Sequence, residues 1–326
     1  MAMQRTDFTQ ALVKRGYEVF WDEYPEVQDV WTALFKEDQV NTPFVERSSM
    51  IGLGDLEEKP EGEPFSYDRP ADGWPVLGRV RTFGRAIAFS MELYEDTQIE
   101  NLFAQTVGQW AQSYQRTRDR WYSRFFNEGS WTTGSPVFDN TVPGVKIDPT
   151  GRFIYDGKPF FTDAGNPHPT KLSDITMVNY FPLPLTHENF QMVWKHMTLN
   201  NSFDEKGDEI DLVPDTLLIH PNLRFKAQEI LNSEFLPNTA TTPSIRNPLR
   251  RIVPNIIEWR RLKDENGWFL LQRQRGMTAL NRKELVLDVW EDPETKEVKA
   301  NVNCRYGGYV DNHRYSIACN TSQSEG

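Results

Sequence analysis

Residues 187–191 come nearest to a catalytic motif in this chain. They read His-Glu-Asn-Phe-Gln, which begins like the zinc-protease motif H-E-x-x-H but has Gln191 where the second histidine belongs. The motif needs two imidazoles one helical turn apart to hold the metal, so this replacement removes half of the metal clamp. We therefore interpret His187 and Glu188 as residues of a first helical turn, where a carboxylate interacts favourably with the helix dipole.

The other metal-binding residue types are scattered along the sequence. Five histidines and two cysteines are present, without the spacing of a zinc site. The acidic turn at residues 204–211 departs from the EF-hand loop because its glycine and terminal glutamate are misplaced. We expect no metal, no cofactor and reduced thiols at Cys304 and Cys319, with a disulfide within or between copies as the open alternative. The histidines, which we interpret as structural, are His168, His187, His196, His220 and His313.

Motifs for other chemistries are missing as well. Gly52 and Gly54 lack the third glycine of a dinucleotide-binding fingerprint, and the sequence has neither a P-loop nor the G-x-S-x-G of a serine hydrolase. Paired carboxylates are plentiful in so acidic a chain, which keeps a carboxylate-dependent hydrolase as the alternative function. We predict that the chain is not an enzyme.

The composition predicts a folded chain that does not grip nucleic acid. Its 326 residues are 38% hydrophobic and 13% aromatic, enough to bury a sizeable core in two or more lobes. Lys and Arg total 36 against 47 Asp and Glu, and the net charge of -11 disfavours a phosphate-binding surface. We expect no membrane partner, because there is neither a secretion signal nor an apolar run long enough to span a bilayer.

The strongest periodic pattern predicts a helix at residues 97–127. Its apolar residues recur with the helical period on one side, and at 1.5 Å per residue the helix would be about 45 Å long. Four arginines, assigned to the opposite side, form a basic end that is either a solvated face or an ionic contact with another copy. These are Arg116, Arg118, Arg120 and Arg124.

Two extended segments, at residues 42–53 and 76–90, predict a long hairpin. Between them, residues 55–75 are acidic and rich in proline and glycine, which prevents regular structure. A loop of about twenty residues is uncommon in a compact domain unless it binds something. We therefore interpret the aromatic residues Phe65, Tyr67 and Trp74 as anchors for a partner.

The rest of the sequence alternates short helices and strands, which predicts an α+β fold. Residues 6–36 indicate an amphipathic arm, and a helix is expected to begin after the N-cap Thr186. A strand at 216–219 precedes a helix that carries Leu223, Ala227 and Ile230. Later strands are predicted at 252–254, 268–272, 285–290 and 298–304, the last two joined by a turn at 292–296.

Several short stretches, taken in order, resemble a known family. They are residues 155–161 (YDGKPFF), 213–223 (VPDTLLIHPNL), 255–259 with 268–270, and 305–309 (RYGGY). With the arm, the hairpin and the long helix, they resemble the major capsid protein of tailed bacteriophages, which has the Hong Kong 97 type of fold. More narrowly, the chain is similar to the Mu-like major head subunit family.

The resemblance implies an α+β subunit of defined parts. It implies an N-terminal arm at 1–40, an extended hairpin loop at 41–90, a peripheral domain at 91–202 and 284–326 with a spine helix at about 97–127, and an axial domain at 203–283. The implied function is self-assembly into pentamers and hexamers of an icosahedral shell that encloses phage DNA without sequence recognition. A cellular compartment shell of the same fold is the alternative.

The implied partners are further copies of the chain, a portal, a separate scaffolding protein and decoration proteins, in a virion assembled in the host cytoplasm. We expect the acidic loop and the basic end of the long helix to meet across a subunit boundary. Exposed pairs of this kind contribute about 0.2–1 kcal/mol each, so they would set register more than strength. The candidate interface residues are Glu57, Glu58, Glu61, Phe65, Tyr67, Trp74, Arg116, Arg118, Arg120 and Arg124.

Overall fold

The computed structural model describes residues 18, 29–51, 58–62, 65, 67, 71–89, 99–139, 141, 151–235, 246–292, 294, 295 and 297–323. Within these ranges the chain forms two five-stranded sheets, a two-stranded pair and helices that pack against them. Long antiparallel strands with separate helices make the fold α+β, as predicted. No helix in these ranges combines the length and the apolar character needed to cross a membrane.

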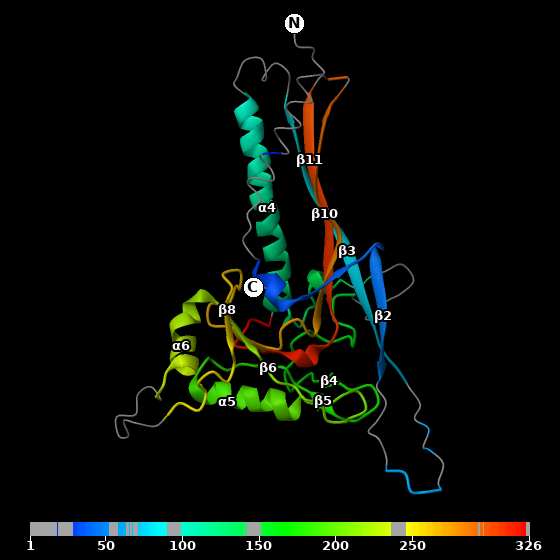
Figure 1. Ribbon diagram of the computed structural model, residues 1–326, viewed down its shortest axis with the longest axis vertical. Coiled ribbons are helices and arrows are strands. Elements are labelled where there is room, and N and C mark those ends of the chain that lie inside the picture. The colour runs from blue at the N-terminus through cyan, green and yellow to red at the C-terminus, as the bar shows by residue number, and fades with distance from the viewer. Residues whose placement is uncertain are drawn as a thin grey trace.

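The first sheet has the strand order β1-β10-β11-β3-β2. β2 and β3 form an antiparallel pair, the predicted hairpin, and β11 pairs antiparallel with both β3 and β10. The long strands run side by side along the long axis of the molecule (Figure 1). The strands are β1 (Lys36–Gln39), β2 (Phe44–Ile51), β3 (Ala71–Phe89), β10 (Met277–Glu291) and β11 (Val298–Val310).

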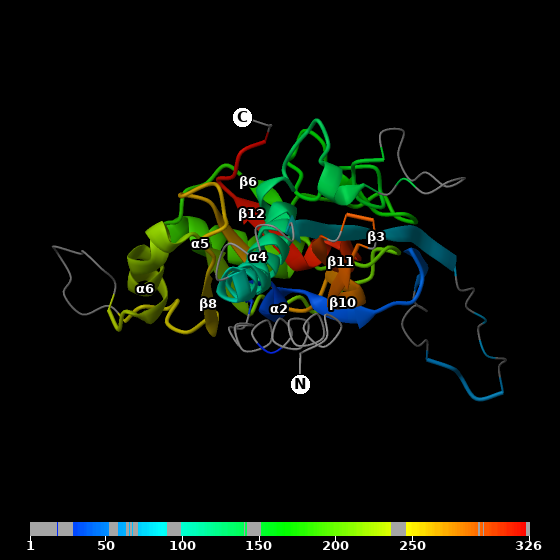
Figure 2. The ribbon, with the colours of Figure 1, turned by 90° about the horizontal axis from the view of Figure 1, so that it is seen from above.

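Helix α4 (Ile99–Asn127) lies along this sheet and matches the predicted helix to within two residues at its start (Figures 1 and 2). Its C-terminal half buries a row of aromatic side chains, and Trp121 meets Tyr306 of β11 edge to face at 5.7 Å between ring centroids. At Gly308 of β11 a Cβ would lie 3.0 Å from the Thr278 carbonyl oxygen of β10, and in ordinary contact with Phe125 of α4 at 3.4 Å from its Cζ. The tight contact at this glycine is therefore within the sheet.

The second sheet has the order β6-β12-β9-β7-β8 and is covered by two short helices (Figure 1). Its strands carry fully buried apolar residues, and Phe190 and Leu231 of the helices join the same core. The strands are β6 (Tyr180–Phe181), β7 (Thr216–Ile219), β8 (Asn255–Glu258), β9 (Trp268–Leu271) and β12 (Ser316–Cys319); the helices are α5 (His187–Lys195) and α6 (Arg224–Asn232). The remaining elements are β4 (His168–Pro169), β5 (Thr176–Met177) and the short helical turns η1 (Pro136–Phe138), η2 (His196–Asn200), η3 (Pro221–Leu223) and η4 (His313–Tyr315).

Among the strands that differ from the sequence prediction are β3, β8 and β10. The strand predicted at 252–254 is wrong: β8 begins after Pro254, which has no N–H for a ladder, and the Asn255 N–H donates to the Asp215 carbonyl. β3 begins at Ala71 instead of 76 although it contains Pro75, because this end of β3 pairs only with β2. β10 starts at Met277, well before the predicted 285. Its pairing with β11 shifts in register between Asn281 and Val286, where its charged residues lie.

Of the predicted N-terminal arm, the structure describes only its end. α2 (Val30–Leu34) packs Trp31 against Tyr122 of α4, with ring centroids 4.3 Å apart and stacked. Strand β1 then joins the first sheet parallel to β10. This end of the arm is therefore part of the core of the subunit.

Candidate functional site

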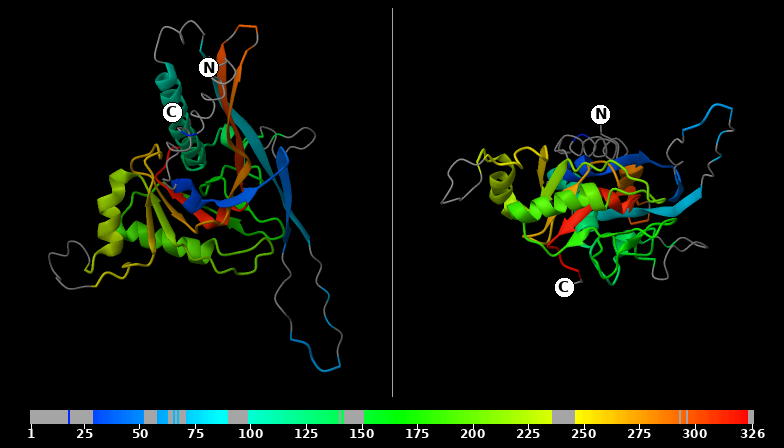
Figure 3. Two further views of the ribbon diagram at one scale, coloured as in Figure 1. Left: turned by 45° about the horizontal axis from the view of Figure 1, so that its top comes forward. Right: turned by 90° about the horizontal axis from the view of Figure 1, so that it is seen from below.

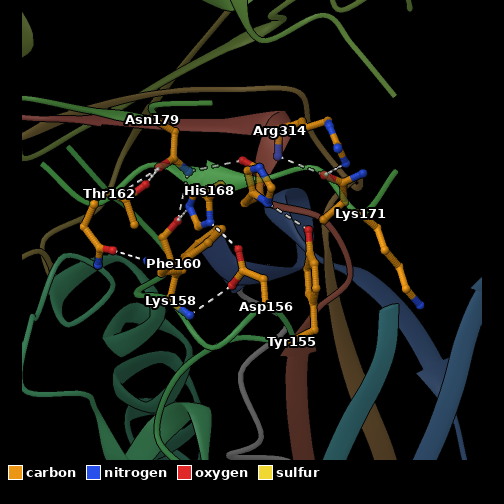
Figure 4. A network of polar contacts seen from close by, with 12 residues as sticks. Tyr155, Asp156, Lys158, Phe160, Thr162, His168, Lys171, Asn179 and Arg314 are labelled. Atoms are coloured by element: carbon orange, nitrogen blue, oxygen red, sulfur yellow. Dashed lines mark hydrogen bonds and ion pairs between the residues drawn. The ribbon is translucent and has the colours of Figure 1, made fainter. Parts of the chain in front are cut away.

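The described residues contain one buried cluster of metal-ligand type, formed by Asp156, His168 and His313. Asp156 lies on a loop, His168 begins β4 and His313 begins η4, so only the tertiary fold brings them together (Figure 4). The two imidazole rings stack with centroids 3.7 Å apart and planes inclined by 14°. His168 Nδ1 lies 2.5 Å from the Asp156 carboxylate, and both side chains are inaccessible to solvent.

Hydrogen bonds from neighbouring segments hold the cluster in place. The Tyr155 hydroxyl lies 2.8 Å from His313 Nδ1, and the Phe160 carbonyl lies 3.3 Å from His168 Nε2. Asn179 donates its amide to the carbonyls of Phe160 and His313, at 2.9 and 3.3 Å (Figure 4). These contacts tie the loop after α4 to the C-terminal segment.

The surroundings keep His313 neutral. Burial lowers the pKa of His313 well below its usual value, and the nearby His168 and Arg314 act in the same direction. Burial also raises the pKa of the Tyr155 hydroxyl, which therefore keeps its proton and shares a hydrogen bond with Nδ1 of the imidazole. The next residue, Arg314, forms an ion pair with Glu205 at 2.8 Å.

The geometry fits a structural cluster held by hydrogen bonds better than a metal centre. A ligand atom from each of the three side chains lies within 4.8 Å of the others. However, an imidazole binds a metal through a lone pair in the ring plane, and the planes of His168 and His313 are almost parallel, so one ion cannot lie in both. No motif in the sequence indicates this cluster, because its three residues are separated in the chain, at positions 156, 168 and 313.

The H-E-x-x-Q segment has the predicted structural role. It opens α5, where the Thr186 hydroxyl accepts a hydrogen bond from the Asn189 N–H at 3.2 Å and Glu188 lies in the first turn. His187 Nε2 lies 3.3 Å from the Asn247 side-chain oxygen. These are the contacts of a capped helix end.

The two cysteines do not form a disulfide. Both are free and buried, Cys304 in β11 of the first sheet and Cys319 in β12 of the second. Burial raises the pKa of the Cys304 thiol to about 11, so this thiol stays protonated at neutral pH. The expectation of reduced thiols fits this arrangement.

The described residues of the acidic loop lie well away from the body of the subunit (Figures 1 and 3). Phe65 and Tyr67 expose 73% and 94% of their surface, and Lys59 Nζ lies 4.5 Å from the centroid of the Phe65 ring. Glu58 and Glu61 are also exposed. Glu57 lies outside the described residues.

The prediction that Trp74 belongs to the loop is wrong. Trp74 lies within β3, is partly buried, and packs on Tyr155 with ring centroids 6.5 Å apart. Lys171 Nζ lies 5.6 Å from the centroid of the same ring. Trp74 thus packs against its own chain.

The prediction that all four arginines lie opposite the apolar face of the helix is wrong, because Arg118 packs on Trp31. The Arg118 guanidinium lies 4.3 Å from the centroid of the Trp31 ring, and Arg124 pairs with Glu128 through two hydrogen bonds of 2.6 and 3.0 Å. Both charges are therefore engaged within the chain. Arg116 and Arg120 are exposed.

Comparison with known proteins gives a family match over most of the chain. A family model described as phage capsid protein matches residues 75–318. No curated protein matches the chain. The matched residues include the second sheet except Cys319, together with most of the first sheet.

Solved structures share the fold at low sequence identity. A chain from Mycobacterium phage Patience superposes with a TM-score of 0.55 and 11% identity, covering 99% of this chain and 90% of that chain. The capsid of cyanophage P-SCSP1u gives 0.55 and 8%, covering 91% and 89%. The mature capsid of bacteriophage PhiM1 gives 0.52 and 10%, covering 90% and 87%. At such identities the likeness concerns the fold.

Proposed function

Because the chain belongs to the phage capsid protein family, its function is to form the shell of a bacteriophage, and we propose that it does so as pentamers and hexamers of an icosahedral particle. Family membership makes it a structural protein, so we do not propose the carboxylate-dependent hydrolase. The match of residues 75–318 to the phage family also favours a virion over a cellular compartment shell.

We propose the Hong Kong 97 type of fold, with the Mu-like head subunits as the nearer group. The order of elements supports it: residues 1–40 would be the arm, 41–90 the extended loop, and α4 the spine helix of the peripheral domain at 91–202 and 284–326. The axial domain, expected at 203–283, would be built on the second sheet with α5 and α6, so it would also take in β6, α5 and β12, which lie outside those bounds. β10 crosses the expected boundary at 283 and pairs within the first sheet, which supports an earlier boundary at that end.

The observation that carries the assembly proposal is the acidic loop. Phe65 and Tyr67 are 73% and 94% exposed on a segment that lies away from both cores. Exposed aromatic side chains on a projecting loop mark an interaction site, because their burial by a partner contributes strongly to binding. In a shell built from one chain, the available partner is a neighbouring copy.

We propose that the packaged DNA is enclosed without sequence recognition. The net charge of -11 supports this, because a chain that is negative overall repels phosphates. A portal, a separate scaffolding protein and decoration proteins are the further partners that a phage shell of this type would use. Assembly would take place in the host cytoplasm.

The test is to replace residues 55–70 by a glycine-serine segment of the same length. The loop keeps its reach but loses its acidic and aromatic side chains. We expect the variant to keep the circular dichroism spectrum and unfolding midpoint of the wild type, because the loop is outside both cores, and to form no shells in electron microscopy. Shells of normal yield and size from this variant would refute the role of the loop.

A further inference from the structure

β3 carries a bulge close to the acidic loop. Its pairing with β2 shifts in register, because Ser48 lies opposite Pro75 but Met50 lies opposite Asp72, so β3 has one residue more than β2 at this point. A bulge bends a strand and increases its twist, which changes the direction in which the strand continues. The acidic loop comes before this end of β3 in the chain. The direction of the loop therefore depends on residues 72–75.

At the bulge, β3 has a partner strand on one side only. β11 pairs with β3 from Arg79 onwards, whereas β2 pairs with it as far as Ala71. In the part of the chain that the structure describes, no strand lies along the other side of β3 at residues 72–75. The backbone carbonyls on that side need hydrogen-bond donors from elsewhere in the chain or from solvent.

Lys171 supplies these hydrogen bonds. Its ammonium donates to the Asp72 carbonyl at 2.7 Å and to the Gly73 carbonyl at 2.6 Å. Successive carbonyls of a regular strand point to opposite sides, so the binding of both by one ammonium is a consequence of the bulge. Lys171 Nζ also faces the ring of the next residue, Trp74. Lys171 thus holds three consecutive residues of β3.

Lys171 is itself fixed to the C-terminal part of the chain. It lies in the turn between β4 and β5, where its N–H donates to one carboxylate oxygen of Glu205 at 2.8 Å. The other oxygen of Glu205 accepts from Arg314 at 2.8 Å, and the Arg314 side chain is only 3% exposed (Figure 4). Arg314 comes directly before Tyr315 and β12. The bulge in the first sheet is therefore tied to the entrance of a strand of the second sheet.

We propose that Lys171 is a positioning residue for assembly, which holds the bulge of β3 so that the acidic loop leaves the subunit in the direction that the shell requires. The inference rests on the proposed role of the loop in assembly and names the residue that orients the loop. A loop that is held in one direction beforehand loses less conformational freedom when a neighbouring copy covers it, so the contact between copies is stronger.

Two substitutions separate the ammonium from the rest of the side chain. Lys171→Met keeps an unbranched stem and removes the donor, so both carbonyls lose their hydrogen bonds. Lys171→Arg keeps several N–H donors and should restore the contact. The matched control is Lys226→Met, at an exposed position on α6. All three variants should unfold at the urea midpoint of the wild type, because both lysines are exposed.

Single-molecule energy transfer measures the direction of the loop in the unassembled subunit. Dyes are attached at Tyr67→Cys on the loop and at Met192→Cys on α5, both exposed positions, whereas the native cysteines are buried and do not react. The wild type, Lys171→Arg and the control should give one narrow distribution of transfer efficiency, and Lys171→Met a broader or shifted one. A broad distribution in the wild type, or an unchanged one in Lys171→Met, overturns the inference.

Assembly followed by light scattering is the second readout, on chains without the dye positions. If the released loop has the required direction in about a tenth of the molecules, the concentration at which Lys171→Met particles first form rises about tenfold. Lys171→Arg should bring this concentration back to that of the wild type. Lys171→Met particles at the wild-type concentration overturn the inference and leave the shell intact. If wild-type chains form no particles, the proposed function itself fails, and energy transfer still decides whether Lys171 orients the loop.

Discussion

His313 should make the folded subunit less stable as the pH falls. Burial, with His168 and Arg314 nearby, lowers its pKa in the folded state well below the usual value near 6.5. Below pH 6.5 the unfolded chain binds a proton that the folded chain does not, so stability is complete above this pH and is lost as the pH decreases towards the folded pKa. Asp156 and Tyr155 are the other groups around the stack.

The size of this effect follows from proton linkage. For one histidine with an unfolded pKa near 6.5 that stays neutral in the fold, the loss between pH 7.5 and 5.5 is about 1.4 kcal/mol. Replacing His313 by Gln removes the titrating group, so this part of the pH dependence should disappear. His196, whose pKa is also lowered by burial, titrates in both proteins and cancels in the comparison.

Urea unfolding at several pH values measures the difference. The unassembled loop-replacement variant provides the soluble subunit, with and without His313→Gln. Between pH 7.5 and 5.5, the free energy of unfolding should decrease by about 1.4 kcal/mol less in the His313→Gln variant than in the same protein with His313. This holds whatever the absolute stability of the variant. Equal slopes with and without His313 would refute a neutral buried imidazole.

Two further predictions concern the helix α4. Trp31→Ala should lower the free energy of unfolding by about 3–5 kcal/mol in the same urea assay, because the substitution leaves a cavity where a side chain only 1% exposed was packed. A loss below about 1 kcal/mol would mean that the end of the arm does not belong to the core. Reversing Arg116 and Arg120 to Glu should slow assembly followed by light scattering at low salt, with less effect at high salt. Glu58→Lys with Glu61→Lys should partly restore the rate, and a failure of this rescue would refute the pairing.

Local patterns predicted the elements that local physics controls. The helical period predicted α4, and the N-cap Thr186 predicted the start of α5, because both signals lie within a few residues. The same helical period also explains why Arg118 lies on the buried face of α4 and not with the exposed arginines. This residue is four positions after Tyr114 and three before Trp121, so helical spacing assigns it to the buried face and not to the basic one.

Tertiary structure decided what local patterns could not. The start of β3 depends on which side of Pro75 has a partner strand, and this follows from sheet order alone. The contact between His168 and His313 requires β4 and η4, which are far apart in the chain, to meet in the fold. No spacing in the sequence indicates this contact, so the cluster could not be predicted. Trp74 could not be placed either, because its place in β3 depends on the pairing of that strand with β2.

Cryo-electron microscopy of particles purified from cells that express the full chain tests most directly whether this protein builds a phage shell. We expect closed particles in which every subunit has the fold described here, with α4 and the first sheet in the wall and the acidic loop of each copy lying on its neighbour. A chain that remains monomeric at every concentration and salt tested, or particles in which the loop contacts no other copy, would contradict this function.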